Sequence, residues 1–229
     1  LVILGDTVGV SVGDLFLGAL IPGLMMSGSF AIYVLAVGFF KPHLAPALPP
    51  EARTMHGWPL LIRTFRAVVP PVALIFMVLG SVFSGIATPT EGGAMGATGA
   101  LALAMARRRI DFKLLRQAMD TTMKLSSFVL FILIGSTVFS LSFQSVDGQK
   151  WVEHLLTGLP GGQLGFLIVV NIIVFFLAFF LDFFELAFII VPMLAPVADK
   201  LGIDLVWFGV LLAVNMQTSF MHPPFGFAL

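Results

Sequence analysis

The sequence predicts an all-α polytopic membrane protein, and three observations lead to this class. Hydrophobic residues make up 59% of the chain, charged residues only 10%, and the mean hydropathy is +1.06, whereas about a quarter of a soluble domain is charged. Several apolar runs reach the roughly 20 residues that a helix needs to cross a bilayer. Two runs are interrupted, at 181–185 and at 221–226. Backbone leaves helical geometry at membrane depth only where it lines a cavity or is buried in protein, so such breaks are typical of a transporter.

Composition and side-chain placement exclude several other classes. The chain has 12 basic and 12 acidic residues and no cysteine, which excludes disulfides and thiolate metal sites and gives no sign of nucleic-acid binding. Its four histidines, His43, His56, His154 and His222, are scattered, and no Ser-Lys or paired-Asp spacing occurs. We therefore expect neither an enzyme nor a bound cofactor.

The first half of the chain is expected to hold a membrane helix, a basic loop and a pair of helices. Residues 15–40 are uncharged, with Gly and Ser spaced as helices packed in lipid use them. A loop at 41–67 contains several prolines and mostly basic charges. The apolar block that follows, 68–106, is interrupted at Thr-Pro-Thr-Glu, residues 88–91.

Basic loops set the predicted topology. The loop before the 68–106 block and the run Arg107–Arg109 after it are rich in Lys and Arg, and such short loops stay on the cytoplasmic side. The block therefore crosses the bilayer an even number of times, as a tight or partly re-entrant pair turning at 88–91. The alternative is that its shorter second arm packs inside protein without spanning. An arm helix, 110–143, then leads to the far side.

Two interrupted elements close the chain. Residues 164–198 are too many for one span and are split by Asp182 and Glu185, so we expect a hairpin that enters and leaves on the same side. A broken helix is expected at 205–229.

Three acids are expected at membrane depth, where a carboxylate costs roughly 2.5–3.5 kcal/mol on insertion scales. Glu91 follows Thr88, Pro89 and Thr90, which is the pattern of a helix start. It is expected either to cap that helix or to act directly in transport. Asp182 lies at the turn of the hairpin and is expected either to bind an ion or only to cap the hairpin. Glu185, three residues on, shares its face or points to water.

A polar string precedes a proline pair in the broken helix. The string includes Asn215, Gln217, Thr218 and Ser219, and the pair is Pro223 and Pro224. Proline removes backbone donors and pushes the preceding residue out of helical geometry, which leaves upstream carbonyls without helical partners. Such oxygen-rich backbone suits a monovalent cation such as Na⁺. The alternative is that the polar side chains only join helices. His222 is expected to act either as a proton relay or as a packing residue.

The order of these motifs resembles the large membrane subunit of the TRAP (tripartite ATP-independent periplasmic) transporters. The resemblance is carried by Gly85–Ala94, by the hairpin ending in Val191–Pro196, by Leu201–Asp204 and by Asn215 through Gly226. It implies two inverted repeats and an elevator motion. Residues 1–67 would be a membrane helix and a connector, and residues 68–229 the second transport repeat. Because the chain begins without Met and stops within a motif, we expect a part of a longer subunit.

The resemblance also implies a Na⁺-driven importer of organic acids in the bacterial inner membrane, working with a small membrane subunit and a periplasmic binding protein. Na⁺ would bind near Asp182, Thr218 and Ser219. The family more often has Thr where this chain has His222, and smaller residues at 183–184, which suggests larger or aromatic substrates. The alternatives are a stand-alone Na⁺- or H⁺-coupled symporter, which needs no binding protein, and a structural scaffold, which needs no buried acids.

Overall fold

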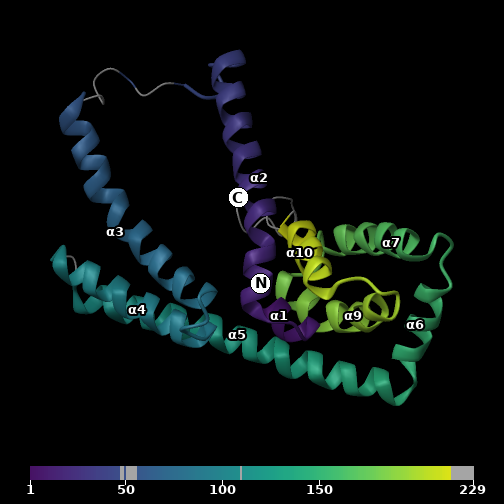
Figure 1. The fold of residues 1–229 in the computed structure, drawn as a ribbon. Helices are drawn as coiled ribbons and strands as arrows, with labels where there is room; N and C mark the ends of the chain where they lie inside the picture. Colours follow the sequence, from purple (N-terminus) through teal and green to yellow (C-terminus); the bar gives the residue numbers. More distant parts are fainter. Residues whose placement is uncertain (47–48, 50–55, 109, 218–229) are drawn as a thin grey trace. The chain divides into compact units, whose positions relative to one another are not determined.

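The computed structural model describes residues 1–46, 49, 56–108 and 110–217, and all regular structure in these ranges is helical (Figure 1). The described residues form two compact units. One contains Leu1–Ala19 and the described residues from Asp111 onward, and the other contains Leu20–Ile110. The predicted division at residue 67 concerns function, so it stays a prediction.

The unit Leu20–Ile110 holds most of α2 (Val12–Phe40), α3 (Trp58–Phe83) and α4 (Pro89–Ala106). The first predicted membrane segment corresponds to α2, which is long and apolar enough to cross a membrane. The predicted loop at 41–67 is wrong at its end, because α3 begins at Trp58. Proline at the start of α3 favours helix initiation, since the first turn has no use for the missing N–H.

Helices α3 and α4 pack against each other as an antiparallel pair. A Cβ built at Gly92 would lie 3.0 Å from Val82 Cγ2, one at Gly96 would lie 3.7 Å from Val78 Cγ2, and one at Gly99 would meet the side chain of Leu74. From Gly92 to Gly99 of α4 the neighbouring residue on α3 moves back from Val82 to Leu74, so the two helices run antiparallel. The glycines let the two backbones approach closely.

The far end of this pair is closed by a hydrogen bond. Arg107 Nη2 donates to the backbone oxygen of Arg66 at 2.8 Å. The turn at Ser84–Thr88 joins the opposite end. The predicted helix pair is thus confirmed, while its depth in the bilayer stays a prediction.

The other unit holds the remaining helices. These are α1 (Val2–Val8), α5 (Phe112–Ser145), α6 (Gly148–Thr157), α7 (Gly162–Leu177), α8 (Phe183–Glu185), the π-helix η2 (Leu186–Ile190), α9 (Val191–Lys200) and α10 (Leu205–Met216). The predicted arm helix is confirmed as α5, a single helix of 34 residues. Helices α1 and α6 were not predicted, because both are short and contain polar residues that disguise their apolar faces.

The hairpin formed by α7, α8, η2 and α9 lies at the centre of this unit, and its apolar side chains form part of the core. Phe166 of α7 and Phe208 of α10 are fully buried, and their ring centroids lie 5.9 Å apart. Leu4 of α1 is also fully buried, and α1 packs against η2, α9 and α10. Helix α6 contacts α7 and α9 at one end of the hairpin (Figure 1).

Three described helices are long and apolar enough to cross a membrane, namely α2, α3 and α5. Helices α7 and α10 are apolar but have only 16 and 12 residues. At about 1.5 Å per residue they reach roughly 24 and 18 Å, less than the hydrocarbon thickness of about 30 Å. A short apolar helix such as α7 is what a hairpin arm requires, whereas the break predicted after α10 lies outside the described residues.

Candidate functional site

The interruption of the hairpin is built around Asp182. Helix α7 ends at Leu177, and Asp182 is the N-cap residue of α8, which begins the returning arm. The side chain is only 9% exposed. The Asp182 backbone N–H donates to Glu185 Oε2 at 3.2 Å, and the two residues form a capping box. Both acids therefore serve the helix start.

Capping leaves the Asp182 carboxylate with further capacity for ligands. An ionised carboxylate has about four acceptor positions, and a capping bond uses one of them. The oxygen atoms lie at a helix N-terminus, where the helix dipole favours negative charge. Capping and ion binding are thus compatible at this residue, and its role in ion binding stays a prediction.

The turn before α4 uses the same device. Thr88 N donates to Glu91 Oε2 at 2.7 Å, Thr88 Oγ1 lies 2.9 Å from the same oxygen, and Glu91 N donates to Thr88 Oγ1 at 3.3 Å. Pro89 and Thr90 occupy the first helical positions. The capping role expected for Glu91 is present. Unlike Asp182, Glu91 is exposed in its own unit.

A π-helical segment follows the Asp182 capping box directly. Leu186 and Val191 are both fully buried, although they are five residues apart. In an α-helix residues five apart diverge, whereas one π turn brings them to the same face. Such π segments occur often at functional sites. Sequence reasoning missed this one, because the apolar run 186–191 shows no period.

A pair of asparagines joins α7 to α10. Asn215 Nδ2 donates to the backbone oxygen of Asn171 and to Asn171 Oδ1, each at 2.9 Å. Asn171 Nδ2 donates in turn to the oxygen of Leu167 at 2.8 Å. Asn215 was a predicted site residue, but Asn171 was missed. The available signal was an amide within the apolar run 164–180, where polar side chains need partners.

The remaining predicted residues divide into two groups. Gln217 is exposed and forms the C-cap of α10. Thr218, Ser219, His222, Pro223 and Pro224 lie outside the described residues, so the break in the predicted broken helix stays a prediction. Of the predicted site, the structure therefore shows the hairpin acids together and the end of α10 held against α7.

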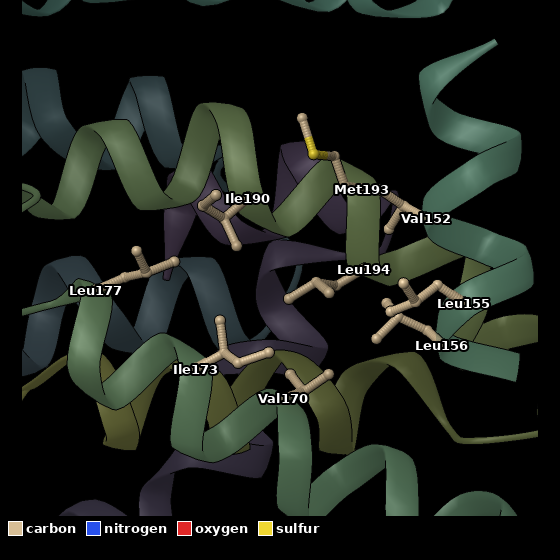
Figure 2. Close-up of a pocket in the computed structure, with 9 residues that line it drawn as sticks. All are labelled: Val152, Leu155, Leu156, Val170, Ile173, Leu177, Ile190, Met193 and Leu194. Atoms are coloured by element: carbon tan, nitrogen blue, oxygen red, sulfur yellow. The ribbon is translucent and has the colours of Figure 1, made fainter. Parts of the chain in front are cut away.

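An apolar cavity separates the two arms of the hairpin. It has a volume of 190 Å³ and lies between α6, α7 and the returning arm. Figure 2 shows the lining side chains directed toward one another from these elements: Val152, Leu155, Leu156, Val170, Ile173, Leu177, Ile190, Met193 and Leu194. The cavity opens to the surface, and its lining offers no polar atom to an ion or to an ordered water. It is therefore a packing space within the hairpin and not an ion site.

These features define an α-helical membrane protein with an interrupted hairpin whose returning arm begins at a buried, capped acid. The chain belongs to the family described as "Tripartite ATP-independent periplasmic transporter, DctM component", whose model matches residues 1–229. The resemblance stated from the motifs is thereby confirmed.

Three curated relatives illustrate the match. The C4-dicarboxylate TRAP transporter large permease protein DctM of Rhodobacter capsulatus is 30% identical over 222 residues, which are 96% of this chain and 48% of that protein. The sialic acid TRAP transporter large permease protein SiaM of Vibrio cholerae is 30% identical over 231 residues, 100% of this chain and 52% of that protein. The 2,3-diketo-L-gulonate TRAP transporter large permease protein YiaN of Escherichia coli is 27% identical over 226 residues, 98% and 52%. The chain thus spans about half the length of these relatives.

Proposed function

We propose that this chain forms the second transport repeat of a large permease subunit that imports organic acids across the bacterial inner membrane, driven by Na⁺. A periplasmic binding protein delivers the substrate, and a small membrane subunit supports the scaffold. The hairpin and the broken helix move across the bilayer together as an elevator. This proposal rests on family membership along the whole chain.

The buried acid at the hairpin interruption is the observation that carries the proposal. Asp182 is 9% exposed and begins the returning arm, and a carboxylate within a membrane segment marks an ion or substrate path by default. A scaffold has no need for such a group. The acid thus favours an ion-coupled transporter over a structural subunit.

The relatives indicate the class of substrate. Their names give C4-dicarboxylates, sialic acid and 2,3-diketo-L-gulonate, which share a carboxylate group. For this chain we propose an organic anion as substrate. Na⁺ is the co-substrate, held by oxygens of Asp182 and of Thr218 and Ser219, which follow α10 in the sequence.

Uptake measurements test the proposal. The full-length subunit and its small partner are reconstituted in proteoliposomes, and uptake of labelled organic acids is measured with and without a Na⁺ gradient and the cognate binding protein. We expect uptake to require both. Uptake with Na⁺ but without the binding protein establishes the stand-alone symporter instead, and uptake driven by a proton gradient alone contradicts Na⁺ coupling.

A matched pair of variants tests the role of Asp182. Asp182→Asn removes the charge but keeps a capping residue, because Asn is as good an N-cap as Asp. Asp204→Asn is the control, since Asp204 Oδ1 caps α10 by accepting from Trp207 N at 2.7 Å and its side chain is exposed. We expect the first variant to weaken Na⁺ dependence and the control to leave it unchanged. Equal Na⁺ dependence in both variants removes Asp182 from the ion site.

A further inference from the structure

The asparagine pair occupies a particular place between the two elements of the proposed site. Asn171 lies on the first hairpin arm, about 9 Å along the helix from Leu177 at 1.5 Å per residue. Asn215 lies in the last turn of α10, two residues before the C-cap residue Gln217. The pair thus fixes the end of α10 to the arm that leads to Asp182.

The geometry of the pair restricts more than the distance between the helices. Asn215 Nδ2 donates to two acceptors of one residue, a backbone oxygen and a side-chain oxygen, both at 2.9 Å. Two bonds from one amide nitrogen to Asn171 fix the plane of the Asn215 amide. Asn171 is itself held by its bond to the oxygen of Leu167. Neither side chain can rotate without breaking a bond.

The surroundings make these bonds matter. The described residues that line the groove beside the pair are otherwise apolar: Ile172, Phe175, Phe176, Leu211 and Val214. Both asparagines are half-buried. In such a setting an amide that loses its partner finds few alternatives, because the surrounding hydrocarbon side chains neither donate nor accept hydrogen bonds.

The end of a helix is also where carbonyl oxygens lack helical partners, and a cation site at a broken helix uses such oxygens. We propose that Asn171 is a positioning residue for ion coupling, which acts by holding Asn215 and with it the C-terminal end of α10. Asn171 does not itself bind the ion. This inference rests on the proposed function, because it assigns a support to the same site.

A second bond from α7 provides the matched control. Gln163 Nε2 donates to the backbone oxygen of Leu201 at 2.7 Å, which ties the start of α7 to the connection between α9 and α10. Gln163→Leu removes one interhelical bond from the same helix without touching Asn215. If hydrogen bonds from α7 only join helices, Asn171→Leu and Gln163→Leu should behave alike.

The experiment uses the full-length subunit with its small partner and binding protein in proteoliposomes. The Na⁺ concentration for half-maximal uptake, the maximal rate and the Tm are measured for each variant. Asn171→Leu removes the Oδ1 acceptor, while the backbone oxygen of residue 171 can still accept from Asn215. Because single interhelical hydrogen bonds in membranes are modest on average, the half-maximal Na⁺ concentration is expected to rise about three- to tenfold in this variant. Asn171→Gln keeps an amide oxygen that can accept from Asn215 and an amide nitrogen that can donate to Leu167, and is expected to hold the half-maximal Na⁺ concentration within about twofold of the wild type. Gln163→Leu is expected to leave it unchanged.

The outcomes separate the inference from the function beneath it. An unchanged Na⁺ requirement in Asn171→Leu, with Na⁺-dependent uptake by the wild type, overturns the positioning role alone. If uptake by the wild type does not depend on Na⁺, Na⁺ coupling is refuted, and the positioning role is refuted with it. Should Asn171→Leu fail to assemble, Asn171→Ser carries the same measurement, because its hydroxyl is too short to replace the amide oxygen.

Discussion

The apolar cavity makes opposite predictions for two neighbouring valines of α7. Val170 and Val174 lie one helical turn apart, and both are buried, at 1% and 0% exposure. Val170 lines the cavity of 190 Å³, whereas Val174 does not. We therefore compare Val170→Leu with Val174→Leu, which add the same methylene group to the same helix face.

The structure sets the size of the two effects. A methylene group added at Val170 enters this space and buries apolar surface worth up to about 0.8 kcal/mol. At Val174 the same group meets packed side chains, and overpacking costs about 1–3 kcal/mol. The two variants should therefore differ by about 2–4 kcal/mol in the free energy of unfolding.

Thermal unfolding of the full-length subunit in detergent, followed by tryptophan fluorescence, measures the difference. We expect Val170→Leu to leave the Tm unchanged or slightly raised and Val174→Leu to lower it. Equal losses of Tm in both variants would show that the space between the hairpin arms is already filled, and the reasoning would then fail.

Three further predictions concern caps, helix pairing and a surface ion pair. Glu91→Ala should lower the Tm by removing the N3 half of the capping box, whereas Glu91→Gln should leave the Tm nearly unchanged because an amide oxygen still accepts; slow transport by a normally stable Glu91→Gln variant contradicts a purely capping role. Gly92→Leu should lower the Tm by forcing α3 and α4 apart, while Gly93→Leu should not, since nothing lies within 4 Å of a Cβ there; similar losses would contradict the pairing. Glu153→Gln breaks the salt bridge between Glu153 and Lys200, whose side chains are 30% and 64% exposed, respectively. The free energy of unfolding should therefore change by less than about 1 kcal/mol. A larger, salt-independent loss would show that this bridge is buried in the assembled protein.

The elements that sequence reasoning predicted are those with strong local signals. Long uncharged runs identified α2 and α5, and the Thr88–Glu91 and Asp182–Glu185 patterns identified two helix starts. In each case residues within four positions of one another carry the information, because capping bonds and apolar runs are local. The start of α3 was missed, since its prolines and arginines also suit a loop.

The unpredicted features depend on contacts across the chain. Helix α1 is short, and its burial follows from packing against η2, α9 and α10. Asn171 and Asn215 are 44 residues apart in the sequence, and their hydrogen bonds form only because α7 packs against α10. The π turn has no sequence period, since it is defined by which apolar residues the core accepts. Tertiary packing decides all three, so local patterns do not contain them.

The π turn has a consequence for the phase of the returning arm. One residue advances an α-helix by about 100°, and a π turn accommodates roughly one residue more than an α turn. The segment 186–190 therefore behaves as a one-residue insertion between the Asp182 capping box and the buried face of α9. Deleting one residue there would restore an uninterrupted α-helix while swinging both hairpin acids about a quarter of a turn around the arm. If two members of the family differ by a single residue at this point, a sequence alignment would match their acids. The matched acids would nevertheless lie at different positions around the helix.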